Sequence, residues 1–203
     1  MKNEIKLSLL GAALVACTLP VLAQSNTATT PVTGQTIKNR KENQQDRISQ
    51  GVASGQLTAG ETSNLEKKES AINQESREMR KLDGGKLTSA DKATLNQQQN
   101  QLSNQIYKDK HNAATLNTNP KSEVGKRGEN QQDRIAQGVK SGQLTAGETS
   151  RLENKEAGIN HEIAADRQAN GGKLTNAERA QVNRQQNQVS KQIYKDKHNN
   201  KHQ

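Results

Sequence analysis

The sequence predicts an all-α protein: two tandem copies of a three-helix unit joined by a linker and preceded by a signal peptide. Three observations support this prediction. Residues 42–112 match residues 129–199 without a gap, with 49 identities in 71 positions. Apolar residues recur at helical spacing on otherwise polar segments, and no segment alternates as a strand does. Finally, a nine-residue stretch at 55–63 returns unchanged at 142–150, where its chemistry ends one helix and starts another.

The composition limits how deep a hydrophobic core can be. Hydrophobic residues make up 29% of the 203 residues, and the chain has no Phe, no Trp and only two Tyr. This content lies well below that of an ordinary globular domain. We therefore expect thin helical bundles that are stabilised by the second copy or by self-association. The net charge of +9 favours acidic partners, although acids and bases alternate along the chain as they do on an ordinary solvated surface.

The first 23 residues have the features of a secretory signal peptide. Two lysines precede a short apolar run at 7–15, and Val-Leu-Ala at 21–23 fits a cleavage site. The residues that end at Cys17, Leu-Val-Ala-Cys, also fit a lipoprotein signal. Because the residues after Cys17 stay apolar, we expect cleavage after position 23, with lipidation as the minor alternative. The mature chain is then exported to the periplasm or beyond, without a transmembrane segment or a disulfide.

These patterns divide the chain into six parts. A linker is expected where Pro120 stands among small polar residues. The parts are a signal peptide at 1–23, a flexible leader at 24–36, a first helical repeat at 37–112, the linker at 113–123, a second helical repeat at 124–199 and a tail at 200–203.

Each repeat is expected to form three helices. In the first repeat they cover about 39–53, 59–81 and 89–110, and each carries a narrow apolar stripe. The expected core of the first repeat consists of Ile37, Ile48, Val52, Leu57, Leu65, Ile72, Met79, Leu82, Leu87, Leu95, Leu102, Ile106 and Tyr107. The matching stripes of the second repeat are Ile135 and Val139, then Leu152, Ile159 and Ile163, then Val182, Val189 and Ile193.

The joints between helices repeat one local chemistry. Gly55 can take the left-handed conformation that closes a helix, and Leu57 can pack against both neighbouring helices. Thr58 can then cap the next helix and form a capping box with Glu61. Related sequences predict the same arrangement three more times. The predicted capping residues are Thr58, Glu61, Thr88, Asp91, Thr145, Glu148, Thr175 and Glu178.

The motif Gly-x-Leu-Thr-x-x-Glu resembles the exit of an EF-hand or dockerin loop, where glycine makes the bend and the final glutamate binds calcium. Aligning Gly55 with the loop glycine puts Gln50, Val52 and Ser54 at the first three ligand positions, and none of them is acidic. The other three loops lack acidic residues there as well. The capping box thus explains the motif without a metal, and a degenerate divalent-cation-binding module is kept as an alternative.

The overall pattern has a second resemblance. A signal peptide followed by repeats of Glu-Asn-Gln-Gln-Asp-Arg-Ile and Gly-x-Leu-Thr-x-x-Glu is similar to exported bacterial tandem-repeat proteins of unknown function. This resemblance implies export and no particular activity.

Two polar segments leave alternatives open. The block Gln-Ile-Tyr-Lys-Asp-Lys-His-Asn at 105–112 and 192–199 could contact a polyanion. It could equally be a helix C-terminus, where lysine suits the helix dipole and tyrosine covers the end of the bundle. The glutamine-rich residues 96–101 could bond to a partner helix, but we expect a solvated face. The candidate interaction residues of the repeated block are Tyr107, Lys108, Lys110, Tyr194, Lys195 and Lys197.

No catalytic constellation is apparent in the sequence. His198 and His202 are four residues apart, but they lie at a chain end. His161 begins a zinc-protease-like motif in which Ala165 stands where the second histidine is required. There is no nucleophile with a base and no carboxylate pair set in an apolar pocket. We therefore expect no enzyme, no catalytic residue, no metal ligand and no cofactor.

The expected function is binding or structural interaction by an exported helical repeat protein. Candidate partners are acidic envelope polymers, another protein or a second copy of the chain. A polyanion-binding envelope protein is a further alternative.

Overall fold

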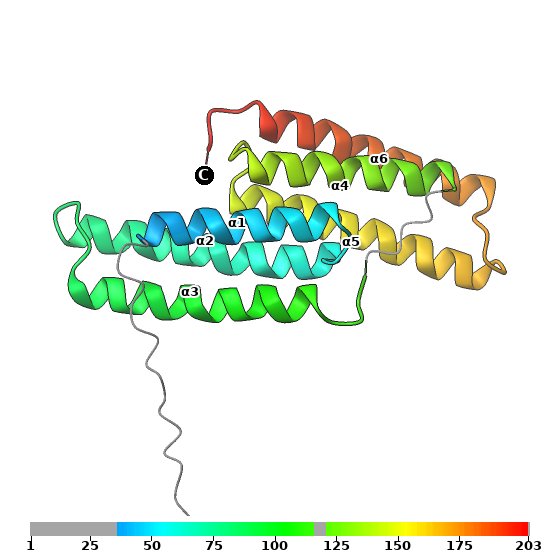
Figure 1. Cartoon of the computed structure of the whole chain (residues 1–203). Coiled ribbons are helices and arrows are strands. Elements are labelled where there is room, and N and C mark those ends of the chain that lie inside the picture. The colour runs from blue at the N-terminus through cyan, green and yellow to red at the C-terminus, as the bar shows by residue number, and fades with distance from the viewer. Residues whose placement is uncertain (1–35, 116–120, 203) are drawn as a thin grey trace, which may run out of the picture. The chain divides into compact units, whose positions relative to one another are not determined.

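The structure is a computed structural model that describes residues 36–115 and 121–202. It is all-α, as predicted, with six helices and no strand within these residues. The predicted signal peptide, Cys17 and nearly all of the leader lie outside the described residues. None of the described helices is both long and apolar enough to span a membrane. The helices are α1 (Ile37–Ala53), α2 (Ala59–Leu82), α3 (Ser89–Lys110), α4 (Glu123–Lys140), α5 (Ala146–Ala169) and α6 (Asn176–Lys197) (Figure 1).

Side-chain caps set where the first helix of each repeat begins. The Thr36 hydroxyl accepts a hydrogen bond from the Asn39 N–H, so α1 starts at Ile37, two residues earlier than expected. The Ser122 hydroxyl accepts one from the Gly125 N–H at 3.0 Å. Helix α4 therefore begins at residue 123, which the sequence analysis placed in the linker, because an N-cap serine satisfies a backbone donor that would otherwise need water.

The six helices pack as two sets that share one interface. Helices α1, α2 and α3 contact one another, and so do α4, α5 and α6. The sets meet through α2 with α5, which is the most extensive helix pair, and through α1 with α4. Among the described helices, α3 contacts only α1 and α2, and α6 contacts only α4 and α5 (Figure 1). The outer helices thus support the inner four without taking part in the interface.

Residues that are 87 positions apart meet each other at this interface. The Ser63 Oγ lies 3.1 Å from the Ser150 Oγ and donates to the Ser150 carbonyl oxygen at 3.0 Å. The Ser49 Oγ donates to the Ala136 carbonyl oxygen at 2.9 Å. Contact between a residue and its own counterpart is the mark of a twofold axis. A local twofold axis therefore passes between Ser63 and Ser150.

The hydrophobic core is divided into two clusters that follow the two sequence repeats, except that Ala136 of α4 belongs to the cluster of the first repeat. Two expected core residues of the first repeat are exposed, and for these the prediction is wrong. Leu82 is 85% exposed because it is the last residue of α2, where no described helix covers it. Tyr107 is 60% exposed. Ile37, Met79 and Leu87 are only partly buried and pack against the edge of the first cluster.

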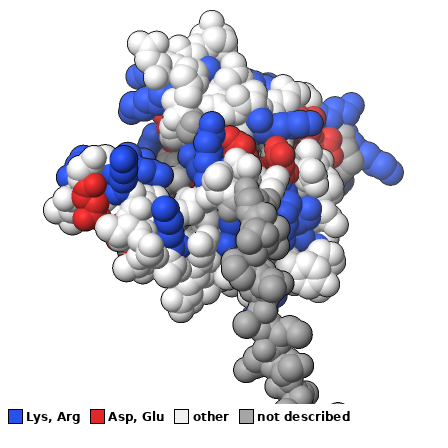
Figure 2. Space-filling model, turned by 60° about the vertical axis from the view of Figure 1, so that its left-hand side comes forward, with Lys and Arg blue, Asp and Glu red and all other residues white. Residues whose placement is uncertain are grey.

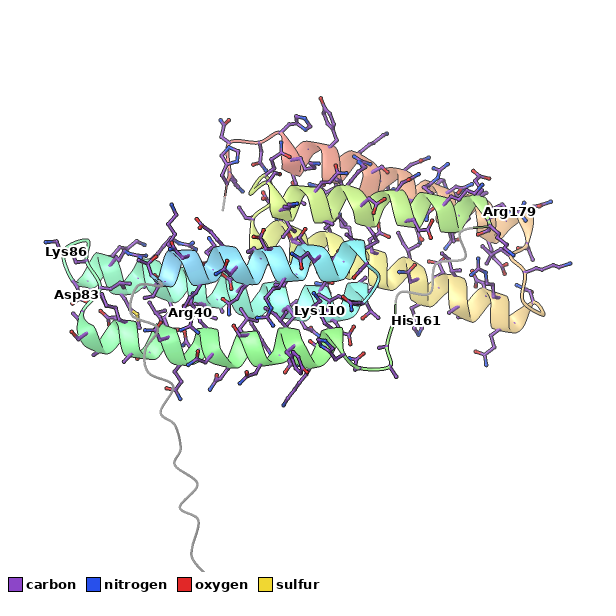
Figure 3. All side chains as sticks on the ribbon, in the orientation of Figure 1. Arg40, Asp83, Lys86, Lys110, His161 and Arg179 are labelled. Carbon is purple, nitrogen blue, oxygen red and sulfur yellow. The ribbon has the colours of Figure 1, made fainter. Side chains whose placement is uncertain are left out.

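Glutamines extend this core with hydrogen bonds, so the expected solvated face on α3 is partly wrong. Gln99 is buried, and its Nε2 donates to the Ile37 carbonyl oxygen at 3.0 Å. The Gln44 Nε2 donates to the Gln99 carbonyl oxygen at 2.7 Å. Nearby, the Arg40 guanidinium on α1 donates to the side chain of Asn96 on α3 (Figure 3). Polar contacts therefore tie α1 to α3 where apolar residues are scarce.

The close approach of α1 to the following joint leaves no space for a side chain at Gly51. A Cβ there would lie 2.6 Å from the Cγ and Cδ1 atoms of Leu57, which is fully buried. We expect Gly51→Ala to lower the free energy of unfolding by about 1–3 kcal/mol, because an overpacked core must shift. Urea denaturation measures the change.

The matched control is Gly158→Ala on α5, where an added Cβ meets nothing within 4 Å. This control should stabilise the helix by up to about 1 kcal/mol, because alanine is the better helix former. Equal effects of the two substitutions would contradict the close packing of Leu57.

Candidate functional site

Four glutamates are buried where α2 and α5 cross. Glu66 and Glu69 on α2 are 0% exposed, and their counterparts on α5, Glu153 and Glu156, are 0% and 1% exposed. Buried carboxylates are rare in proteins unless they are paired. The burial of these four carboxyl groups was not predicted from the sequence. The burial arises from contact between the two repeats, which a local pattern does not reveal.

The first glutamate of each pair receives one hydrogen bond from a neighbouring helix. The Gln45 Nε2 on α1 donates to the Glu66 Oε2 at 3.2 Å, and the Gln132 Nε2 on α4 donates to the Glu153 Oε2 at 3.0 Å. The Oε1 atom of each glutamate is buried and accepts no hydrogen bond from the described residues. These carboxyl groups are therefore only half satisfied.

Burial shifts the titration of all four groups upward, because a charge is poorly solvated in the interior. Burial raises the pKa of Glu66 to about 8 and the pKa of Glu69 and Glu156 to about 7. Burial also raises the pKa of Glu153 well above its ordinary value, and repulsion from Glu156 and Glu66 adds to that rise. The crossing thus holds carboxyl groups that keep their protons to a higher pH than surface glutamates do.

The second glutamates of the two pairs have different neighbours. Lys41 on α1 lies close enough to Glu69 for its charge to oppose the rise in the pKa of Glu69. The same position on α4 is Gly128. The rise in the pKa of Glu156 is caused by burial alone, so no nearby cation offsets its charge. The charge of Glu69 is thus partly offset by a lysine that forms no hydrogen bond with it, and the charge of Glu156 is not offset in this way.

Two cavities flank the crossing, and they occupy equivalent places in the two repeats. The smaller cavity, of about 220 Å³, is lined by Lys41, Ser70, Asn73 and Arg77 together with residues 145–147. The larger cavity, of about 680 Å³, is lined by the counterparts Gly128, Ala157, Asn160 and Ala164 together with residues 58–60. Each cavity lies between one repeat and the first turn of α2 or α5 in the other.

The larger cavity is open because its wall residues are smaller. Gly128, Ala157 and Ala164 stand where the first repeat has Lys41, Ser70 and Arg77. The asparagine is the same in both cavities, and so are the Thr-Ala-Gly residues at 58–60 and 145–147. Val124 and Ile163 also line the larger cavity and make it apolar. Three substitutions by glycine or alanine, together with Thr115 where the smaller cavity has His202, thus distinguish the two equivalent places.

An arginine stands at the rim of the larger cavity. Arg167 lines both this cavity and an adjoining hollow of about 410 Å³. In the first repeat its counterpart, Arg80, donates to the Ser76 Oγ at 2.7 Å. The second repeat has Ile163 in place of that serine. The Arg167 carbonyl oxygen accepts a hydrogen bond from the Gly172 N–H at 2.7 Å, but its side chain has no hydrogen bond or ion pair within the described part of the chain. Its guanidinium is available to an anionic group at the mouth.

The eight predicted capping residues lie at the starts of α2, α3, α5 and α6. Each threonine hydroxyl accepts a hydrogen bond from the backbone N–H of the acid three residues later, and that acid accepts one from the threonine N–H. For Thr58 and Glu61 the two distances are 3.3 and 2.9 Å. Gly55, which precedes this cap, has a φ of 69°. The capping residues hold the joints, and Thr58 also lines the larger cavity.

The two tyrosines of the repeated block face solvent. Tyr107 and Tyr194 are 60% and 62% exposed, so the alternative in which they cover the end of a bundle is wrong. Each ring stacks on the histidine four residues later, His111 or His198, with ring centroids 4.2 Å apart. The tyrosines are held at the surface by a local contact within their own helix end.

The lysines of that block divide into two kinds. Lys108 and Lys195 are exposed, whereas Lys110 and Lys197 are partly buried. Burial lowers the pKa of Lys110 and of Lys197, and the Lys197 Nζ donates to the Arg134 carbonyl oxygen at 3.4 Å. Figure 3 shows Lys110 at the end of α3 that lies beside α1. The partly buried pair therefore contributes packing, and the exposed pair remains open to a partner.

Cationic side chains are spread widely over the surface. Figure 2 shows Lys and Arg at many separate places on one face, with Asp and Glu among them. Within the described ranges, no group of three or more His, Cys, Asp or Glu side chains could hold a metal ion. His161 is exposed on α5 (Figure 3). The geometry therefore draws attention to the helix crossing rather than to a metal centre.

The residues of this crossing were missed by sequence reasoning, although two signals were present. Glu66 is next to Leu65, and Glu69 lies four residues after Leu65 and three before Ile72, so both stand at the buried side of α2. Comparison of the two repeats also shows that Gly128 replaces a lysine in an otherwise similar segment.

No family model, curated protein or solved structure matches the chain. Function is therefore inferred from the two repeats themselves, in which each place at the crossing serves as a reference for the other.

Proposed function

We propose that this chain is an exported protein in which two copies of a three-helix unit are fused, and that it acts by binding a small molecule rather than by catalysis. Residues 1–23 support export, because they have the charge, apolar run and cleavage site of a signal peptide. The 49 identities in 71 positions support the two copies. The ligand site is the cavity of about 680 Å³ beside α5.

A single observation carries this proposal: equivalent places in the two copies differ in size while the surrounding scaffold is the same. The first copy fills its place with Lys41 and Arg77, and the second has Gly128 and Ala164. A packed interior does not tolerate an empty space without cost, because lost contacts destabilise it. Larger side chains can fill this place, as the first copy shows. A cavity that is nevertheless kept open in the second copy is the expected arrangement for a ligand site.

The lining of the cavity also fits a small ligand. Ligand sites are mostly apolar concavities of roughly 300–1,000 Å³ with a few polar groups that fix orientation. Val124, Ala157 and Ile163 supply the apolar wall, and Asn160 and Arg167 supply polar groups. The site is large enough for a compact molecule and too small for a folded partner.

The test is a thermal-shift screen of small amphiphilic compounds on the wild-type chain and on Gly128→Lys. This variant should fold, because the first copy accommodates a lysine at the equivalent place. Ligands of the cavity should raise the unfolding temperature of the wild-type chain only. Saturation at about 100 times Kd stabilises a protein by about 2.7 kcal/mol, which such a screen detects. If no compound separates the two proteins, the proposal fails.

The two alternatives from the sequence have less support. A divalent-cation-binding module would use acidic ligands that the four glycine loops do not supply. A polyanion-binding envelope protein would use the exposed lysines Lys108 and Lys195 beside the tyrosines, at two separate helix ends. Binding to acidic envelope polymers or to another protein remains compatible with a small-molecule site, because these surfaces lie away from the larger cavity's lining.

A further inference from the structure

The buried glutamate beside the larger cavity indicates the chemistry of its ligand. Glu156 is not itself a lining residue, but it precedes Ala157 and lies one helical turn before Asn160, and both of these residues line the cavity. The residue is only 1% exposed, and its Oε1 is buried without a hydrogen-bond partner in the described structure. An unpaired carboxyl group in the interior is costly. A hydrogen-bond donor or a cation on a ligand would offset this cost.

The first copy shows which donor fits this place. Lys41 reaches from α1 to the neighbourhood of Glu69, the counterpart of Glu156, and lines the smaller cavity. Its side chain is an unbranched stem of four methylene groups that ends in an ammonium group. In the second copy, Gly128 removes both the stem and the ammonium group and leaves open space. The missing group therefore has a known shape, length and charge.

We propose that the larger cavity binds a primary amine on an unbranched alkyl chain, with the ammonium group attracted by Glu156 as the Lys41 ammonium is attracted by Glu69 without a direct hydrogen bond. This inference rests on the proposed function and specifies its ligand class. The alkyl chain lies along Val124, Ala157 and Ile163, and Asn160 faces the ligand as Asn73 faces the smaller cavity.

The free end of the ligand points to the mouth of the cavity. Arg167 and Gln168 stand there, so a carboxylate or another polar acceptor at that end gains a partner. A neutral alcohol of the same length would occupy the space along the apolar wall but leave Glu156 unpaired. Discrimination between an amine and an alcohol is therefore the property that separates this proposal from a plain apolar cavity.

Binding is expected to depend on pH. Burial raises the pKa of Glu156 to about 7, so the carboxylate that attracts the ammonium group forms mainly above that pH. Among the charged groups of α5, Glu153 is the one that interacts with Glu156, and it also interacts with Glu66 of α2. Helix α4 contributes the uncharged Gly128 and Gln132. Affinity should therefore increase from pH 6 to pH 8, where alkylamines are still protonated.

The experiment follows backbone amide signals of the isotopically labelled full chain by NMR during titration with n-pentylamine and, separately, with n-pentanol at pH 8. Pentylamine should shift the signals of Gly128 and Asn160 and should bind at least about tenfold more tightly than pentanol, as expected for a buried charge pair. N-acetyl-lysine methylamide tests the same ammonium group on a peptide backbone. The relative affinities of the two amines then identify a free amine or a lysine side chain as the better source.

Two variants make the test specific. Glu156→Gln keeps the shape of the site and should abolish the preference for amine over alcohol. Gly128→Lys should abolish the response to both compounds, while its dispersed spectrum shows that it is folded. Lys41→Gly with Arg77→Ala should open the equivalent place in the first copy and add a second set of shifted signals around Asn73.

Equal binding of pentylamine and pentanol to the wild-type chain would overturn the ammonium assignment and leave the small-molecule site standing. An unchanged response in Gly128→Lys would overturn the location of the site. If the proposed function itself is wrong, the result is different. In that case the thermal-shift screen also finds no compound that raises the unfolding temperature of the wild-type chain more than that of Gly128→Lys.

Discussion

The double variant Glu66→Gln, Glu153→Gln should be markedly more stable than the wild-type chain at pH 8 and of similar stability at pH 5. Glutamine has the shape of a protonated glutamate and cannot ionise. Burial raises the pKa of Glu66 to about 8 and the pKa of Glu153 well above its ordinary value. At pH 5 both carboxyl groups of the folded wild-type chain keep their protons, so the substitution changes the free energy of unfolding little.

The direction in which stability changes with pH follows from proton linkage. Between the ordinary glutamate pKa of about 4.5 and the raised values, the folded chain holds protons that the unfolded chain has released. The free energy of unfolding therefore falls as pH rises through this window. Each such carboxyl contributes a slope of about 1.4 kcal/mol per pH unit. The variant removes two of these contributions and leaves those of Glu69 and Glu156.

Urea denaturation at half-unit steps from pH 5 to pH 8.5 measures both slopes. The control is Glu78→Gln on the same helix, where the carboxylate is exposed and pairs with Lys81. Its pH profile should run parallel to that of the wild-type chain. If the double variant also runs parallel, the carboxyl groups at the crossing do not titrate as their burial requires.

The second large effect concerns the separated halves. A fragment of residues 121–202 should associate into a symmetric dimer whose unfolding temperature rises with its concentration. Without α1 and α2, the inner faces of α4 and α5 are exposed to water, and the interface they lose is already close to twofold. A second copy of the fragment can replace the missing partner, because Ser150 would then meet another Ser150 as it now meets Ser63.

Analytical ultracentrifugation and thermal melts over a hundredfold range of concentration test this expectation. The full chain is the control, since its halves are linked and its unfolding temperature should not depend on concentration. A fragment that stays monomeric, fully helical and stable at all concentrations would contradict the role assigned to the α2–α5 contact.

The helices and their joints were predictable from the sequence because their causes are local. Gly55, Thr58 and Glu61 act on neighbouring backbone groups, so a short stretch contains all that the joint requires. The expected bounds of α2 and α3 agree with the structure to within one residue. The prediction that Leu82 is buried was wrong because helical periodicity indicates which side of the helix a residue faces. It does not indicate whether another helix extends far enough to cover that residue.

The carboxyl groups at the crossing could not be read from the sequence in the same way. A glutamate on a polar helix is ordinarily solvated, and only the packing of α5 against α2 buries Glu66 and Glu69. Identity between the repeats gave no help, because recent duplication preserves every residue for a time. The informative positions were those where the repeats differ, above all Gly128.

The meeting of Ser49 with Ala136 has a consequence for how such a protein can change. In a dimer of identical chains, every mutation appears on both sides of the axis, so a serine there would face a serine and an emptied cavity would be emptied twice. When both sides of the axis belong to one chain, that constraint does not apply. Here one side of the axis donates a hydroxyl and the other offers a carbonyl. One half is thus free to remain the structural support while the other acquires new chemistry.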